Sequence, residues 1–319
     1  MRVGQNPIKT INEVARPERI TVAVLNYIPM LSGYYADLLN VLKACLNSIH
    51  ETADLPFDLM VFDNGSCDEV LQYLVDENQA GRIRYLILSE KNMGKGGAWN
   101  VIFGAAPGEI LVYTDNDALF YPGWLSRSIQ LLETYPNVGM VTARPYHSKP
   151  EYFTRTVEWA RATEDAALEE GRFLSWEDFS SFSMSLGYSE EQTKEWYANS
   201  HEIKLTYKDV PAIVGSSHWQ FCGYKHLLQT FLPFQMDRPM GQVKQLDQRV
   251  NDAGYLRLMV TDPLVQNMSN TLPKELAAKT AVEKPIRRNS GLARRLAQLP
   301  GIRGGLLGIY DAIFRLYYE

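Results

Sequence analysis

Residues 109–117 read EILVYTDND, an apolar run that stops at three polar residues. Such a run predicts a buried strand, because a central strand of a parallel sheet is covered on both faces. Three similar apolar runs come before it: ITVAVLNY at 20–27, FDLMVF at 57–62 and IRYLIL at 83–88. Segments with helical spacing of apolar residues lie between these runs. Strands that alternate with helices predict an α/β fold, with a mainly parallel sheet and helices on both faces.

Polar residues stand at or just after the carboxyl ends of these four predicted strands: Asn26, Asp63, Asn92 and Asp115. In open parallel sheets, ligands bind at this edge. We therefore expect the chemistry of the protein to gather there.

The pattern changes after Pro145. Residues 151–200 are polar and rich in Glu and aromatic residues, and they predict a helical insertion that covers the carboxyl edge of the sheet. Ser175 and Ser189 are expected to cap helices, and Gly187 to end one. Strands are expected again at 210–214 and 256–260, with helices around 226–231 and 243–253. The chain thus divides into an extension at 1–19, a first half at 20–145, a second half at 146–273 and a tail at 274–319.

The chain has 319 residues, of which 45% are hydrophobic, and a net charge of −5. A nucleic-acid-binding protein normally carries a basic surplus, so nucleic acid is excluded as a general partner. Three cysteines without CxxC spacing favour a reducing, cytoplasmic compartment. No apolar run reaches the roughly 18 residues that predict a membrane-spanning helix.

Asp115 and Asp117 stand two residues apart at a predicted strand end. Two such carboxylates can share one hard cation, Mg²⁺ or Mn²⁺, which often bridges to substrate phosphates. A solvated turn or a helix cap is the alternative for so short a motif. Likewise Asp63, in FDNGS, forms either a plain Asx turn or an acceptor for a nucleotide base.

Residues 92–97 read NMGKGG and open a predicted helix, where backbone can approach a phosphate closely. This is not a P-loop, because Gly96 follows Lys95 where Ser or Thr is required. It is not a dinucleotide fingerprint either, because Trp99 stands at the third glycine position.

In this order, VAVLNY, FDNGS, NMGKGGAWN and VYTDNDALFYPGWL resemble the family 2 glycosyltransferases, which have a Rossmann-like GT-A fold. The resemblance implies that residues 20–145 bind a nucleotide sugar and that 146–273 bind the acceptor. It also implies roles for individual residues at the nucleotide: Asn26 and Tyr27 line the nucleobase pocket, and Asp63 binds the nucleobase. Asn92 and Lys95 lie near the nucleobase, the ribose or the pyrophosphate. Asp115 lies near the ribose and the metal, and Asp117 is the more direct metal ligand.

The second half resembles the family less closely. GSSHWQFCGYKHLL, at 215–228, fits the segment that faces the acceptor, so His218 and Trp219 are candidate acceptor contacts. A core Trp beside a hydrogen-bonded His is the alternative for this pair.

LDQRVNDAGY, at 246–255, resembles the helix that carries the catalytic base, although Gln242 and Val243 replace the Glu-Asp that many members have. Asp247 is the predicted base and Asp237 the alternative, while an exposed helix acid is the plain interpretation of Asp247. Asn267 stands where many relatives have a metal-binding His, so it is a further candidate metal ligand.

The resemblance implies sugar transfer from a nucleotide-diphosphate sugar to an acceptor hydroxyl of a glycan or lipid-linked molecule. It implies inversion, a divalent metal (Mn²⁺ or Mg²⁺) and an Asp general base. Two alternatives stay open. One is a catalytically silent nucleotide-sugar-binding or scaffold relative. The other is a GT-A-fold nucleotidyltransferase, which usually has a basic Gly-rich loop where this chain has NYIPMLSGYY at 26–35.

The tail at 274–319 holds nine basic and four acidic residues and ends in apolar and Tyr-rich sequence. This composition suits an interfacial helix on an anionic membrane, which would place the protein peripherally on the inner face of the cell membrane. A helix docked on the domain and a homodimer contact are the alternatives.

Overall fold

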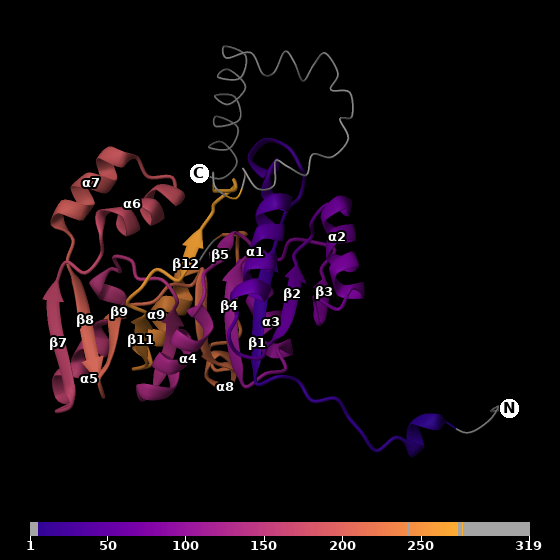
Figure 1. Cartoon of the computed structure of the whole chain (residues 1–319), viewed down its shortest axis with the longest axis horizontal. Helices are drawn as coiled ribbons and strands as arrows, with labels where there is room; N and C mark the ends of the chain where they lie inside the picture. Colours follow the sequence, from indigo (N-terminus) through magenta and orange to yellow (C-terminus); the bar gives the residue numbers. More distant parts are fainter. Residues whose placement is uncertain (1–5, 241–242, 274–275, 277–319) are drawn as a thin grey trace, which may run out of the picture. The chain divides into compact units, whose positions relative to one another are not determined.

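The computed structural model describes residues 6–240, 243–273 and 276 (Figure 1). These residues form a ten-stranded sheet, in the order β3-β2-β1-β4-β10-β6-β11-β9-β8-β7, and a two-stranded sheet of β5 and β12. The strands run as follows: β1 (Ile20–Asn26), β2 (Asp58–Asp63), β3 (Tyr85–Leu88), β4 (Ile110–Asp115), β5 (Ala118–Phe120), β6 (Val138–Thr142), β7 (Ala166–Gly171), β8 (Glu202–Tyr207), β9 (Val210–Val214), β10 (Gln220–Tyr224), β11 (Leu256–Met259) and β12 (Val265–Asn267).

The first four strands are parallel to one another, as the alternating sequence pattern predicts. The apolar runs that predict them are the buried strands β1, β2 and β4. The register places Asn26 beside Asp63 and Leu25 beside Asp115. The polar ends of these strands therefore meet at one edge of the sheet.

Strand β10 comes from the second half of the chain and lies between β4 and β6, antiparallel to both. Beyond β6, β11 is parallel to it, whereas β9, β8 and β7 follow in antiparallel pairs. The sheet is thus mixed, with its parallel part in the first half of the sequence.

The insertion at 151–200 is not entirely helical, which corrects the sequence-based expectation. Residues 166–171, AALEEG, form β7 at the edge of the sheet and pair with β8. Ala, Leu and Glu favour helix locally, but pairing with a neighbouring strand outweighs that weak preference. The helix boundaries are confirmed: Ser175 and Ser189 cap helices, and Gly187, at a φ of +91°, follows the end of one.

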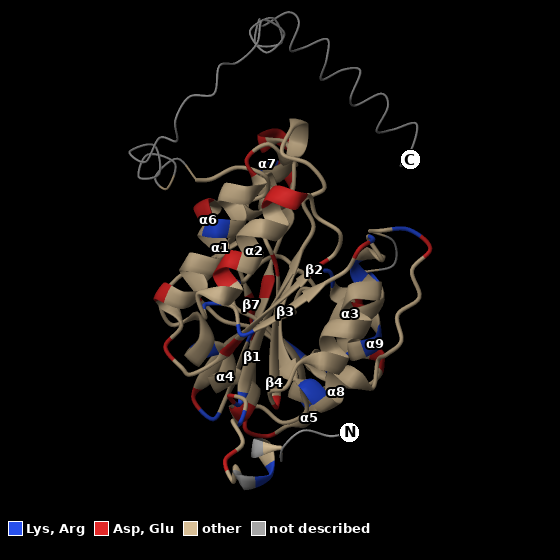
Figure 2. Cartoon of the chain, turned by 90° about the vertical axis from the view of Figure 1, so that its right-hand side faces the viewer, with Lys and Arg blue, Asp and Glu red and all other residues tan. Residues whose placement is uncertain are grey.

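Helices cover both faces of the sheet, as predicted. Figure 2 shows α1, α2 and α4 on one side of the strands and α3, α8 and α9 on the other. The helices run as follows: α1 (Leu38–Thr52), α2 (Asp68–Gln79), α3 (Gly94–Ala105), α4 (Trp124–Thr134), α5 (Thr154–Ala162), α6 (Trp176–Ser185), α7 (Glu190–Asn199), α8 (Lys225–Gln229) and α9 (Lys244–Asp252), with 3-10 turns η1 (Pro7–Thr10), η2 (Gly33–Tyr35) and η3 (Pro150–Tyr152).

A large apolar cluster joins α3, α8 and α9 to the sheet. Its members from these helices are Ala98, Trp99, Ile102, Phe103, Leu227, Leu228, Leu246 and Val250. Because α3 comes from the first half and α8 and α9 from the second, this cluster binds the two halves into one core.

Gly139 lets α9 approach the sheet closely. A Cβ atom on Gly139 would lie 2.5 Å from Cγ1 of Val250 and 2.8 Å from Cβ of Tyr255. We expect Gly139→Ala to destabilise the protein by about 1–3 kcal/mol, because a packed core resists added volume. Gly104→Ala on α3, where nothing lies within 4 Å, is the control and should stabilise by about 0.5–1 kcal/mol. Thermal unfolding compares the two, and equal melting temperatures would contradict the close packing of α9.

Among the described residues, no helix is long and apolar enough to cross a bilayer. The predicted basic tail at 274–319 lies outside the described residues, Leu276 excepted. Its membrane, docking and dimer interpretations therefore stay predictions.

Candidate functional site

The loop after β2 is held by Asp63, whose carboxylate is fully buried. Its Oδ1 accepts a hydrogen bond from Nδ2 of Asn26 at 2.7 Å, and its Oδ2 accepts from the amides of Gly65 (3.2 Å) and Ser66 (2.9 Å). Gly65 has a φ of +93°, and a Cβ there would lie 3.1 Å from the Asn92 amide. In this structure Asp63 therefore fixes the loop, as an Asx turn does. Its predicted contact with a nucleotide base stays a prediction.

Asn64, which is not among the predicted site residues, joins this loop to the start of α3. Its Nδ2 donates to Oδ1 of Asn92 at 2.9 Å, and its Oδ1 accepts from the Met93 amide at 3.0 Å. Asn92 also accepts from the Gly94 amide at 2.8 Å. These amide groups already have partners, so they hold the loop rather than present free N–H groups at the helix start. The signal in the sequence is the Asn-Gly pair, which favours a turn but does not indicate what the Asn64 side chain contacts.

Asn26 and Tyr27 lie where the first strand ends. Asn26 is buried and accepts a hydrogen bond from Nδ2 of Asn116 at 2.6 Å. Tyr27 is half-buried, and its ring stands edge-on to that of Tyr35. Asn116, the middle residue of DND, thus ties the end of β4 to the end of β1.

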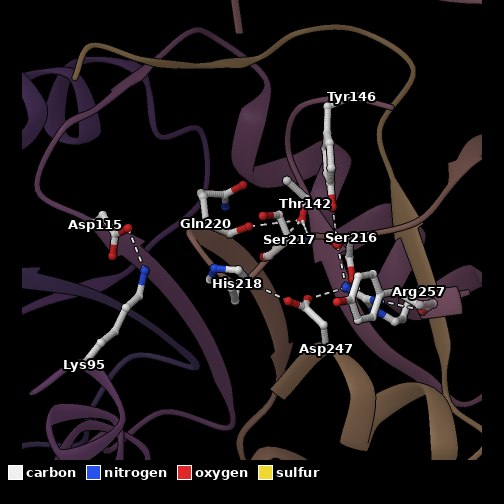
Figure 3. Close-up of polar contacts among 11 residues, drawn as sticks. Lys95, Asp115, Thr142, Tyr146, Ser216, Ser217, His218, Gln220, Asp247 and Arg257 are labelled. Atoms are coloured by element: carbon white, nitrogen blue, oxygen red, sulfur yellow. Dashed lines mark hydrogen bonds and ion pairs between the residues drawn. The ribbon is translucent and has the colours of Figure 1, made fainter. Parts of the chain in front are cut away.

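Lys95 and Asp115 form an ion pair, with Nζ 2.7 Å from Oδ2 (Figure 3). Lys95 is 6% exposed, whereas Asp115 is 28% exposed. The second oxygen of Asp115 accepts from the hydroxyl of Tyr113 at 2.6 Å. Burial and the neighbouring carboxylate raise the pKa of Tyr113 well above its usual value, so its hydroxyl stays a donor. The pair places a nearly buried ammonium at the carboxyl edge of the sheet.

Asp117 differs from Asp115, because its Oδ1 is buried without a hydrogen-bond partner among the residues that the structure describes. Burial, and next the charge of Asp115, raise its pKa to about 7, and Lys95 opposes this shift. An ionised carboxylate in such a place needs a cation. The Asp117 backbone carbonyl accepts from the Met268 amide at 2.7 Å, and β12 pairs Asn267 with Ala118. Asn267, the third predicted metal ligand, is therefore brought to this motif, and its Oδ1 accepts from the Ser269 amide at 2.7 Å.

Within the described part of the chain, no three Asp, Glu, His or Cys side chains gather as a metal cluster. The carboxylate oxygens of Asp117 and Asp115 and the amide oxygen of Asn267 are nevertheless the kinds of ligand that a small hard cation prefers. The residues present are thus compatible with Mg²⁺ or Mn²⁺.

A second polar group surrounds Asp247 on α9. Its Oδ2 lies 2.5 Å from Nδ1 of His218, and its Oδ1 is paired with Nη2 of Arg257 (Figure 3). The side chains of Asp247 and Arg257 are 7% and 1% exposed. Asp247 is therefore neither an exposed helix acid nor isolated, and His218 is its partner.

Arg257 on β11 is a further member of this group that the sequence does not predict. Its Nε donates to Oγ of Ser216 at 2.8 Å, and its Nη1 donates to the Tyr152 carbonyl at 2.5 Å. Tyr146 donates to the Ser216 carbonyl at 2.6 Å, and burial raises its pKa to about 12. The available signal was a charged residue in the middle of the apolar run LRLM, which is rare unless the charge is paired.

Trp219 links the two polar groups. Its carbonyl accepts from the Asp115 amide at 2.9 Å, and within the described part of the chain its own buried Nε1 has no partner. The indole is 7% exposed and packs on Phe182 of α6, with ring centroids 5.6 Å apart. Trp219 is thus mostly core, and α6 of the insertion covers it.

Asp237, the alternative base, is exposed in the segment between α8 and α9. The nearby Pro239 carbonyl accepts from the Lys95 amide at 3.0 Å. This segment therefore borders the Lys95 end of the site, whereas Asp247 borders the His218 end.

The family model described as glycosyl transferase family 2 matches residues 34–200, more than half of the chain. An uncharacterized glycosyltransferase of Nostoc sp. is 26% identical over 123 residues, which are 39% of this chain and 35% of that protein.

Two solved structures are similar at lower identity. A mannosyltransferase of Pyrobaculum calidifontis, in complex with GDP-Man and Mn²⁺, is 19% identical with a TM-score of 0.44, over 78% of this chain and 55% of that one. S. aureus TarS 1–349, in complex with UDP, is 14% identical with a TM-score of 0.45, over 78% and 59%. The chain spans about a third to three fifths of the length of these proteins. From the family match and its own α/β sheet, the chain belongs to glycosyltransferase family 2 and has a GT-A fold.

Proposed function

We propose that the protein moves a sugar from a nucleotide-diphosphate sugar to the hydroxyl of a glycan or lipid-linked acceptor, with inversion at the anomeric carbon. The observation that carries this proposal is the meeting of two polar groups beside β4 and β10, one around Asp115 and one around Asp247. The hydrogen bond from the Asp115 amide to the Trp219 carbonyl keeps them adjacent. A transferase that inverts in one displacement needs such an arrangement, with leaving-group stabilisation on one side of the sugar and a base on the other.

The donor would lie against the first group. We place the nucleobase of the donor near Asn26, Tyr27 and Asp63. We place the ribose and diphosphate between Asn92, Lys95 and Asp115. The ammonium of Lys95 then faces the charge that grows on the departing diphosphate, in a poorly solvated place where electrostatic stabilisation is strong.

A divalent cation, Mn²⁺ or Mg²⁺, would be held by Asp117, with Asp115 and Asn267 as further ligands. When bound, it would supply positive charge to the diphosphate as it leaves. The unpartnered oxygen of Asp117 supports this assignment.

The acceptor would lie against His218, with the mostly buried Trp219 behind it as packing. The pair formed by His218 and Asp247 would receive the proton of its hydroxyl. A catalytically silent relative that only binds a nucleotide sugar would need the polar group around Asp115 but would have no use for the pair of His218 and Asp247.

The proposal is tested by thermal unfolding with UDP, GDP and their sugars, each with and without Mn²⁺. A nucleotide that binds the folded state raises the melting temperature. The nucleotide found in this way is then offered as its sugars, and donor consumption is measured with and without acceptor mixtures. Tight nucleotide binding without consumption of any donor would favour the silent relative.

Lys95→Met is expected to weaken binding of the nucleoside diphosphate about 10–100-fold. The physical reason is the loss of a charge-assisted contact, worth about 1.5–3 kcal/mol. Titration calorimetry measures this, with the exposed Lys208→Met as the matched control. Equal affinity of the two variants would contradict a diphosphate near Lys95.

A further inference from the structure

We infer that His218 is the base that takes the proton of the acceptor hydroxyl, and that Asp247 is a positioning residue that orients the His218 imidazole. The inference rests on the proposed function and names the proton acceptor within it. It replaces the expectation of an Asp base by an Asp–His pair.

Asp247 is badly placed to accept a proton itself. One of its oxygens is bound to Arg257 and the other to Nδ1 of His218, and its side chain is 7% exposed. Protonation would weaken the bond to Arg257, whose guanidinium is 1% exposed. A buried charge that loses its partner is strongly unfavourable. Both oxygens of Asp247 are therefore already engaged as acceptors.

His218 has the complementary properties. Its side chain is 22% exposed, and its Nδ1 faces the carboxylate of Asp247. A carboxylate only accepts hydrogen bonds, so the neutral imidazole carries its proton on Nδ1 and leaves a lone pair on Nε2. Among the described residues, no hydrogen bond occupies that Nε2 atom. The tautomer required of a base is thus set by Asp247.

The neighbouring side chains hold the His218 imidazole in place, close to the polar group around Asp115 where the sugar donor is proposed to bind. The ring of His218 stands edge-on to Trp99, with centroids 6.5 Å apart, and Trp99 also lies 5.7 Å from Nζ of Lys95. The following residue, Trp219, is bonded through its carbonyl to the Asp115 amide. A sugar bound between the two groups would have the diphosphate toward Lys95 and the acceptor toward His218.

In the reaction, the acceptor oxygen forms a bond to the anomeric carbon, and its proton moves to Nε2 of His218. The bond from the anomeric carbon to the diphosphate oxygen breaks, and its electron pair leaves with the nucleoside diphosphate. The imidazolium that forms stands against the Asp247 carboxylate, which stabilises it. The proton is later released to water.

Arg257 makes a sharp test possible. Its guanidinium can only donate hydrogen bonds, so in Asp247→Asn it would pair with the oxygen of the new side-chain amide. The NH₂ group of that amide would then point toward His218. Nδ1 must then accept, and the proton moves to Nε2, where it blocks the base. Nitrogen-15 NMR distinguishes the two tautomers, and the chain has only five histidines, of which His218 is assigned by its loss in His218→Ala. The expected result is an Nδ1–H imidazole in the wild type and an Nε2–H imidazole in Asp247→Asn.

Kinetics provide the second measurement. His218→Ala should lower kcat by about 10²–10⁴-fold, the usual contribution of a general base, with nucleotide affinity nearly unchanged. Added imidazole should restore part of the lost rate. The exposed His201→Ala is the matched control and should keep wild-type activity. Combining Asp247→Asn with His218→Ala should lower kcat little further than His218→Ala alone.

Two results would overturn the inference: an Nε2–H tautomer in the wild type, or a His218→Ala enzyme within about threefold of the wild-type kcat. The second result, with transfer intact, leaves the proposed function standing. A wild type that binds nucleotide and transfers no sugar refutes the proposed function instead.

Discussion

Asp117→Asn should lower sugar transfer by about 10²–10³-fold and, in the absence of metal, raise the melting temperature. The loss of activity follows from removing a charged ligand of the cation that stabilises the leaving diphosphate. The gain in stability follows from removing a buried negative charge, one of whose oxygens has no hydrogen-bond partner among the described residues, which is worth about 1–3 kcal/mol. Function and stability would therefore change in opposite directions.

The pH dependence of this gain has a definite sign. The pKa of Asp117 is raised from 3.8 to about 7 in the folded protein, so the folded state binds this proton more tightly than the unfolded state. Wild-type stability is then lost as pH rises from about 4 to 7. The stabilisation by Asp117→Asn should be greatest above pH 7 and vanish near pH 4.

Thermal unfolding in chelator across this pH range measures the effect. Asp165→Asn, at an exposed turn, is the control and should change neither stability nor activity. A lower melting temperature for metal-free Asp117→Asn at pH 8 would show that Asp117 is satisfied inside the protein and is not a cation ligand.

Arg257→Met is expected to destabilise the protein by about 3–5 kcal/mol. The substitution leaves the charge of Asp247 buried without its Arg257 partner. It also removes the hydrogen bonds that Arg257 donates to the Ser216 hydroxyl and the Tyr152 carbonyl. Denaturant unfolding measures the loss. Because the penalty comes from the charge left behind, adding Asp247→Leu should recover part of the stability.

A surface ion pair provides the comparison. Arg155 and Glu158 are paired at 2.7 Å, but their side chains are 51% and 59% exposed. Arg155→Met should therefore cost less than about 1 kcal/mol. If both Arg→Met variants unfold alike, the Asp247–Arg257 pair contributes no more than a solvated contact.

The sequence was sufficient for features that local residues determine. The apolar runs before Asn26, Asp63 and Asp115 predicted parallel strands, and the polar residues after them predicted a shared edge. Ser175 and Ser189 were recognised as caps because a cap depends on the next three residues.

Features that depend on distant partners were missed or only partly predicted. Residues 166–171 favour helix by composition, and only pairing with β8 makes them a strand. Asp247 was recognised as important, but its environment comes from His218, 29 residues before it, and Arg257, ten residues after it. No local pattern in a single sequence joins these three. The chemistry assigned to Asp247 therefore changes once its neighbours are known.

The position of β10 between β4 and β6 has a consequence for dissecting the protein. The family match covers residues 34–200, yet β1 and β10, the two neighbours of β4, lie outside that range. A fragment trimmed to the match would leave the strand that carries Asp115 with two bare edges, which invite aggregation. The boundaries of sequence similarity are thus not boundaries of an independently folding unit, and expression of a shortened enzyme should keep at least residues 20–273, so that β12 and its pairing with β5 are retained.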